Sequence, residues 1–247
     1  MKKIYEKNEL NFALLWIGLY VVLFSVADSV SASIGIAKLV TAPFCIVMTG
    51  FLYVWICKNG LKEKYGLCKF KGELKTYLYF IPLVLLTSIH VWWGLRLNMS
   101  VLETLLYILS MLGVGFLEEV IFRGFLFKAM CKDNVTSAIV VSSITFGFGH
   151  IVNLLNGRDI PETLLQICYA TAIGFLFTII FYKGKGLWPC IVTHGVFNSL
   201  SVFANKEAAT VSKDIVVSVF LCIVSVVYSV YILKKTGQED IDNSLVG

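Results

Sequence analysis

The chain alternates long apolar runs with short polar segments. Several runs approach the roughly 20 residues that an α-helix needs to cross the hydrocarbon core of a bilayer, and few charges interrupt them. This pattern predicts an all-α, polytopic membrane protein with about eight transmembrane helices. The predicted spans are residues 10–29, 33–57, 77–96, 100–127, 134–154, 162–182, 187–204 and 214–233.

Composition supports this reading. Hydrophobic residues make up 57% of the chain and the mean hydropathy is +0.80, which a water-soluble domain of this length would not show. The spans leave no room between them for a soluble domain of ordinary size. The sequence therefore predicts a single integral-membrane domain, residues 1–247, whose catalytic-type core covers residues 100–205.

The distribution of Lys and Arg predicts the orientation, because cytoplasmic loops carry an excess of basic residues. With both termini in the cytoplasm, fifteen basic residues lie inside and four outside, and Lys38 and Arg123 fall within spans. The inner residues are Lys2, Lys3, Lys7, Lys58, Lys62, Lys64, Lys69, Lys71, Lys75, Lys128, Lys132, Lys183, Lys185, Lys234 and Lys235. The outer ones are Arg96, Arg158, Lys206 and Lys213. Compact size and the lack of eukaryotic targeting signals favour a bacterial plasma membrane.

The net charge of +5 concentrates in the predicted cytoplasmic loops, beside anionic lipid headgroups. It forms no nucleic-acid-binding face, so the expected partners are the lipid bilayer and a peptide or membrane-tethered protein. The seven cysteines are scattered singly and are typical of small buried hydrophobic residues. A signal peptide in the first apolar run is an alternative, although its removal would place the two termini on opposite sides of the membrane.

Two adjacent glutamates interrupt the fourth apolar run. Glu118 and Glu119 are about 100° apart around a helix, so they point in different directions and are expected to have different roles. Glu119 and Arg123 are spaced i,i+4 and can form an ion pair, which leaves Glu118 without a local cation. An unpaired carboxyl in apolar surroundings is a candidate general acid or base. Alternatively, both glutamates only fix helix packing.

Two histidines lie in later apolar runs. His150 follows Gly147 and Gly149, which allow close backbone approach, and Asn153 shares its helical face. A histidine in this position is either a second catalytic residue or an interhelical hydrogen-bond partner.

His194 and Asn198 are spaced i,i+4 in the run opened by Trp188 and Pro189, so both point into one site. Their paired donors suit stabilisation of a developing oxyanion, and a polar clasp between helices is the alternative. The third histidine, His90, precedes Trp92 and Trp93 and is interpreted as a membrane-interface residue.

These three segments together resemble the CPBP family of intramembrane proteases, which contains the type II CAAX prenyl endopeptidases and the bacterial Abi-type proteins. The family pattern of two glutamates, three intervening residues and an arginine stands here as Glu118, Glu119 and Arg123. The aromatic-x-x-x-His pattern stands as Phe146 and His150, and the final His-x-x-x-Asn as His194 and Asn198.

The resemblance implies an intramembrane endopeptidase that uses a glutamate and needs no cofactor. Glu118 and His150 would activate water, His194 and Asn198 would hold the oxyanion, and Glu119 and Arg123 would support the site. Which of the two glutamates is the base stays open, as do oligomeric state, the cleavage site and any need for prenylation. A bacterial member is expected to cut an unprenylated peptide or leader sequence.

Three other functions are compatible with the same residues. Glu118, Glu119, His150 and His194 could ligate zinc in a membrane metalloprotease, although no H-E-x-x-H motif is present. The polar cluster could instead bind a peptide without cutting it, as in a bacteriocin-immunity protein. Buried carboxylates also serve proton relays in transporters, but no inverted repeat is visible.

Overall fold

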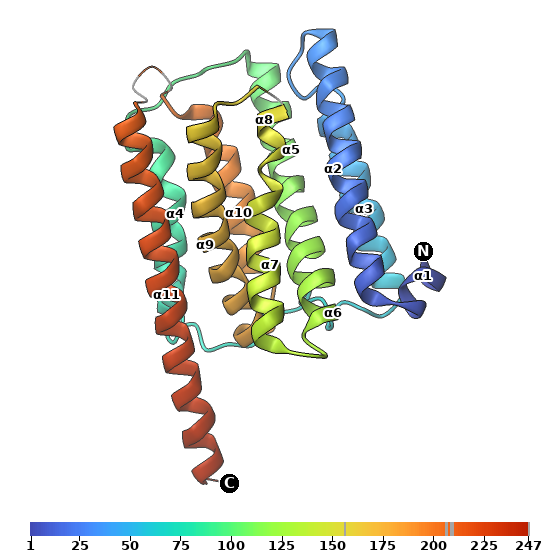
Figure 1. The fold of residues 1–247 in the computed structure, drawn as a ribbon, viewed down its shortest axis with the longest axis vertical. Coiled ribbons are helices and arrows are strands. Elements are labelled where there is room, and N and C mark those ends of the chain that lie inside the picture. The colour runs from blue at the N-terminus through green and yellow to red at the C-terminus, as the bar shows by residue number, and fades with distance from the viewer. Residues whose placement is uncertain (156, 206, 208–209, 247) are drawn as a thin grey trace.

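The computed structural model describes residues 1–155, 157–205, 207 and 210–246, with side chains described up to residue 237 except that of residue 155. Within these residues the fold is a bundle of helices running roughly parallel to one long axis, without strands (Figure 1). The helices are α1 (Lys2–Lys7), α2 (Glu9–Ile34), α3 (Thr41–Lys58), α4 (Ile81–Thr87), α5 (Val101–Glu119), α6 (Lys128–Met130), α7 (Val135–Gly149), α8 (Val152–Leu155), α9 (Ile160–Gly184), α10 (Trp188–Leu200) and α11 (Val211–Val246). The all-α class predicted from the sequence is confirmed.

Six helical stretches among the described residues are long and apolar enough to cross a membrane. They correspond to six of the eight predicted spans, namely Glu9–Ile34, Thr41–Lys58, Val101–Met130, Val135–Leu154, Ile160–Gly184 and Val211–Gly237. The third predicted span is the shorter apolar helix Leu78–Val91, and the seventh is the 13-residue helix α10. The count of eight crossings therefore stays a prediction.

The second span begins at Thr41, so the predicted start at residue 33 is wrong. Helix α2 continues to Ile34 and ends at Gly35, whose φ of 82° is the left-handed conformation that glycine adopts easily. The turn that follows is held by Lys38, whose Nζ lies 2.8 Å from Asp28 Oδ1, and by Thr41 Oγ1, which donates to the same oxygen at 2.5 Å. These contacts bring α3 back against α2.

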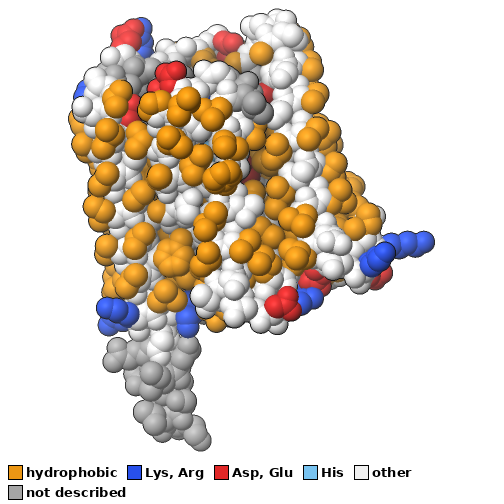
Figure 2. Space-filling model, viewed as in Figure 1, with side chains coloured by type: hydrophobic (Ala, Val, Ile, Leu, Met, Phe, Trp, Pro, Cys, Tyr) orange, Lys and Arg blue, Asp and Glu red, His pale blue; other side chains and the backbone are white. Residues whose placement is uncertain are grey.

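The face of the bundle seen in Figure 2 is apolar across its middle, and charged side chains gather mostly at its two ends. Side chains such as Val22, Val47, Val84 and Val227 are at least 60% exposed, which is typical of lipid-facing positions. The described chain is thus a multi-pass membrane protein. Lys206, one of the four basic residues predicted outside, lies outside the described residues.

Glycines set how closely the central helices approach. A Cβ on Gly115 of α5 would lie 2.6 Å from the backbone nitrogen of Gly195 on α10. A Cβ on Gly147 of α7 would lie 2.0 Å from Thr171 Oγ1 on α9. Gly147 therefore has the close-approach role predicted for it, whereas Gly149 does not, because no atom lies within 4 Å of its would-be Cβ.

Candidate active site

Helix α5 changes its winding directly after the two glutamates. Glu118 and Glu119 form its last turn, and a π-helical segment, Val120–Phe127, follows without a break. Single π-helical segments inside longer helices are frequent at functional sites. All eight residues of this segment are buried, so Arg123 within it also faces the interior.

Glu119 and Arg123 form the intrahelical ion pair predicted from their spacing. Arg123 Nη1 donates to Glu119 Oε1 at 3.1 Å, and both side chains are 0% exposed. A charge in this position is tolerated only when it is paired, because transfer from water costs each ion several kcal/mol. Among the described residues, Glu119 Oε2, Arg123 Nε and Arg123 Nη2 have no hydrogen-bond partner.

Aromatic rings provide further support for the guanidinium. Arg123 Cζ lies 4.1 Å from the centre of the Phe146 ring and 5.7 Å from that of Phe177. Gly174 of α9 leaves room for the guanidinium, since a Cβ at this position would lie 3.0 Å from Arg123 Nη2. Phe146, the aromatic residue four positions before His150, therefore contacts the arginine of the glutamate segment.

His194 connects α10 to both glutamates. Its Nδ1 lies 2.8 Å from Glu119 Oε1, and its Nε2 lies 3.5 Å from Glu118 Oε2. Because Glu119 Oε1 also accepts from Arg123, it is best described as the acceptor of a hydrogen bond from Nδ1–H of His194. Only Nε2 of His194 then remains for Glu118 or for a substrate.

Tyr20 is a site residue that the sequence analysis missed. Its hydroxyl donates to Glu118 Oε1 at 2.5 Å, across 98 residues of sequence. Glu118 therefore has a partner after all, supplied by α2 rather than by its own helix. A single tyrosine in an apolar run carries no signal of its own, because tyrosines in such runs usually contribute packing area and one hydrogen bond anywhere within reach.

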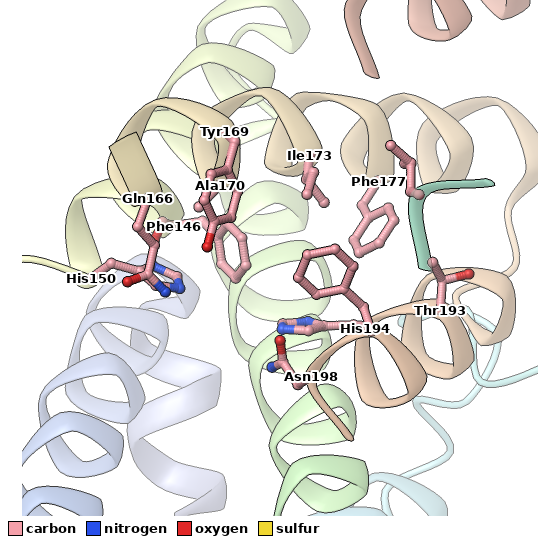
Figure 3. A pocket seen from close by; sticks show the side chains of 12 residues that line it. Phe146, His150, Gln166, Tyr169, Ala170, Ile173, Phe177, Thr193, His194 and Asn198 are labelled. Carbon is pink, nitrogen blue, oxygen red and sulfur yellow. The ribbon is translucent and has the colours of Figure 1, made fainter. Parts of the chain in front are cut away.

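A small cleft lies among α4, α7, α9 and α10. His150, His194 and Asn198 line it, so three of the four predicted catalytic residues share one space. Figure 3 shows His150 beside Gln166 at one end and His194 beside Asn198 further along. The remaining lining residues are Leu86, Phe146, Tyr169, Ala170, Ile173, Phe177, Thr193 and Phe197.

Glu118 is not part of this lining. Its side chain is 15% exposed and lies beside His194, which itself lines the cleft. The Phe146 ring centre is 5.6 Å from the ring of His150 and 5.6 Å from that of His194. The structure thus brings Glu118, Glu119, Arg123 and His194 into one contact network. No hydrogen bond joins His150 to Glu118 in the described residues.

His150 lies at the C-terminal end of α7. Its Nδ1 is 3.2 Å from the carbonyl oxygen of Phe146. Asn153 donates to Gln166 Oε1 at 2.8 Å, and Arg158 donates to the same oxygen at 2.6 Å. The side chain of Asn153 thus fixes Gln166, which lines the same end of the cleft as His150.

His90 packs into the bundle behind this cleft. Its ring centre lies 4.7 Å from that of Phe197, and its Nε2 is buried without a hydrogen-bond partner in the described part of the chain. The interpretation of His90 as a membrane-interface residue stays a prediction, and the structure adds that its ring contacts Phe197 of α10. Trp92 and Trp93 are both partly exposed, at 38% and 40%.

The described residues contain no group of three or more His, Cys, Asp or Glu side chains arranged to hold a metal ion. The zinc-dependent alternative stays a matter for experiment.

Fold and site together define a class: a multi-pass helical membrane protein with a buried Glu-Arg-His network beside an intramembrane cleft. Known proteins narrow this class. Residues 100–200 match the family model described as type II CAAX prenyl endopeptidase Rce1-like. The resemblance inferred from the three motifs is thereby confirmed over that segment, which runs from α5 into α10.

One curated relative is similar to this chain over 104 residues, about as many as the family model covers. The chain is 33% identical over 104 residues to the "Putative membrane peptidase YdiL" of Bacillus subtilis (strain 168), which corresponds to 42% of this chain and 38% of the relative. The chain thus covers well under half of that relative's length. No solved structure matches this chain. Helix α2, with Tyr20, lies outside the segment that the family model covers.

Proposed function

We propose that this protein is an intramembrane endopeptidase that hydrolyses a peptide bond in a membrane-associated peptide or protein. The observation that carries the proposal is the Glu119-Arg123-His194 network, fully or almost fully buried, with Glu118 on one side of His194 and the cleft on the other. The family match over residues 100–200 and the peptidase relative support it. The relative's organism also supports location in a bacterial plasma membrane.

In the proposed reaction, Glu118 and His150 activate a water molecule. The water oxygen attacks the carbonyl carbon of the substrate, and its proton passes to Glu118 or His150. The same proton then moves to the nitrogen of the leaving amine as the C–N bond breaks. Positioned acids and bases of this kind accelerate a reaction by roughly 10²–10⁴-fold.

His194 and Asn198 are the proposed hydrogen-bond donors to the oxyanion. Both line the cleft, and they are one helical turn apart on α10. Because Nδ1 of His194 faces Glu119, His194 would donate from Nε2, which requires the imidazolium form with a proton on both ring nitrogens, and Asn198 would donate from its amide nitrogen. Donors fixed before the reaction stabilise developing charge without reorganisation, which is usually the largest electrostatic contribution to catalysis.

The proposal requires a bridge between Glu118 and His150. Glu118 contacts His194 and Tyr20, and His150 lies beyond the Phe146 ring. A water molecule or the substrate itself has to occupy the intervening space for the two side chains to act on one proton. This requirement makes the His150 variant as informative as the Glu118 variant.

The test is cleavage of a mixed peptide library by purified protein in detergent, with new termini identified by mass spectrometry. Wild type is expected to cleave, whereas Glu118→Gln and His150→Ala are expected to lose nearly all activity. Glu73→Gln, which alters an exposed carboxylate in the loop before α4, is the matched control and should retain activity.

Each other outcome of this experiment points elsewhere. Cleavage that a chelator abolishes would favour the zinc-dependent alternative. Cleavage by Glu118→Gln at the wild-type rate would contradict the role of Glu118. Absence of cleavage, with one peptide bound equally by all variants, would favour the binding or immunity function.

A further inference from the structure

Tyr20 reaches the site from a helix that the family model does not cover. It lies near the middle of α2 (Figure 1). Helix α2 also packs against the π-helical segment that follows the glutamates. The bond from the Tyr20 hydroxyl to Glu118 Oε1 therefore ties the N-terminal part of the chain to the candidate base.

The surroundings of the Tyr20 ring are apolar and fix its position. Its centre lies 4.6 Å from that of Phe24, and Phe24 in turn packs on Phe44 of α3 at 5.3 Å. A hydroxyl held in this way has few other partners within the membrane, and an O–H donor to a carboxylate at 2.5 Å is at the short, strong end of the usual range.

The two oxygens of Glu118 have separate environments. Oε1 accepts from Tyr20, whereas Oε2 lies 3.5 Å from His194 Nε2, on the side of the residue that lines the cleft. Without the tyrosine hydroxyl, nothing else shown for Oε1 would hold the carboxylate in this rotation. The contact with Tyr20 thus fixes the rotation of the carboxylate group, so that its other oxygen faces His194.

We propose that Tyr20 is a positioning residue of the peptidase site, which holds Glu118 through Oε1 so that Oε2 is directed toward His194 and the substrate. This inference rests on the proposed function, in that Glu118 is taken as the base. It adds a residue from α2 to a site otherwise built from α5, the π-helical segment, α7 and α10. Tyr20 would act through its contact with Glu118.

Tyr20→Phe removes only the hydroxyl and keeps the ring that packs on Phe24. Misplacement of a catalytic group by about 1 Å can cost roughly 10²-fold in rate, so kcat is expected to fall on the order of 10- to 100-fold. KM and the thermal unfolding midpoint are expected to stay at the wild-type values, because substrate contacts and packing are unchanged. A purely structural role would move the midpoint instead.

Tyr53→Phe is the matched control. Tyr53 lies on α3, and its ring packs against Phe116 of α5 at 6.3 Å between centres, so it loses the same atom next to the same helix. Its kcat should equal that of wild type. An unchanged kcat in Tyr20→Phe, or a loss accompanied by an equal loss in Tyr53→Phe, would overturn the positioning role.

Infrared spectroscopy separates this inference from the proposed function. The carboxyl band of Glu118 is the one that disappears in Glu118→Gln, and it should shift in Tyr20→Phe and stay in place in Tyr53→Phe. A shifted band in a protein that cleaves no peptide would refute the peptidase and with it the positioning role, while leaving the contact established. An unshifted band would refute the contact.

Discussion

At the scale of single residues, the unusual feature is a fully buried arginine inside a membrane protein. Arg123 is 0% exposed, pairs with Glu119 and lies between the rings of Phe146 and Phe177. Since a buried charge without its partner is far more costly than the pair, each half of the pair depends on the other. This dependence holds His194 in place as well, because Glu119 accepts from both.

Glu119→Gln should therefore destabilise the protein strongly. The substitution leaves Arg123 charged and unpaired, and breaking a buried ion pair in this way costs about 3–5 kcal/mol. Thermal unfolding in detergent should show a clearly lowered midpoint. The double variant Glu119→Gln with Arg123→Met removes both charges and should recover part of that loss. Equal midpoints for wild type and Glu119→Gln would contradict this account of the pair.

At the scale of helices, close packing between α7 and α9 fixes one wall of the cleft. Phe146 and His150 come from α7, and Gln166, Tyr169 and Ile173 come from α9. The two helices approach at Gly147, where a Cβ would overlap both Thr171 Oγ1 and the carbonyl oxygen of Ile167, at 2.0 and 2.8 Å. A methyl group here has to push the helices apart.

Gly147→Ala is expected to lower the free energy of unfolding by about 1–3 kcal/mol, the usual cost of overpacking. It should also lower activity, because the separation moves Phe146 away from Arg123. Gly149→Ala is the control on the same helix, since its Cβ meets nothing within 4 Å. Unfolding and cleavage assays on both variants test the contact: equal stability of the two would show that α7 and α9 are not in close contact at Gly147.

The winding of α5 is a second feature at this scale. Sequence spacing predicted the Glu119–Arg123 pair from ordinary α-helical geometry, and the pair forms at the boundary where π-helical winding begins. The hydropathy pattern predicted one continuous span over residues 100–127, without the change in winding. The π-helical segment Val120–Phe127 packs against both α2 and α7.

At the scale of the whole molecule, the fold places the cleft relative to the two membrane faces. Helix α1 and the C-terminal end of α11 lie at one end of the bundle, and α8, next to His150, lies at the other (Figure 1). The basic residues predicted to be cytoplasmic belong to the end that holds α1 and the C-terminal end of α11. If both termini are cytoplasmic, as the distribution of Lys and Arg predicts, the His150 end of the cleft is expected to face the outer side of the membrane.

Cysteine labelling in intact cells tests this orientation. Leu97→Cys adds an exposed thiol between α4 and α5, and Asp133→Cys adds one between α6 and α7. A membrane-impermeant maleimide should label Leu97→Cys in intact cells and Asp133→Cys only after lysis, with wild type giving the background from native cysteines. The reverse pattern would place the termini outside and the His150 end of the cleft in the cytoplasm.

The sequence by itself determined the class of the protein and most of the candidate site. Hydrophobic length and charge asymmetry depend on the chain alone, so the helical membrane fold followed from them, and the i,i+4 spacing of Glu119 and Arg123 gave a contact that is local along one helix. Family resemblance marked the residues of α7 and α10 for the same site. Prediction failed where a turn sets the end of a helix, as at the start of α3 at Thr41. The ion pair between Lys38 and Asp28 that holds this turn leaves no signal in hydropathy.

Only the tertiary structure decided which side chains meet across helices. The bridge from His194 to both glutamates, the position of Phe146 over Arg123, and the bond from Tyr20 to Glu118 all join residues far apart in sequence. Such contacts depend on how deeply each helix is placed and how it is rotated, and those are fixed by close packing at Gly115, Gly147 and Gly195. Hydropathy averages over a helix and holds no record of its rotation, which is why the partner of Glu118 could be found only in the folded chain.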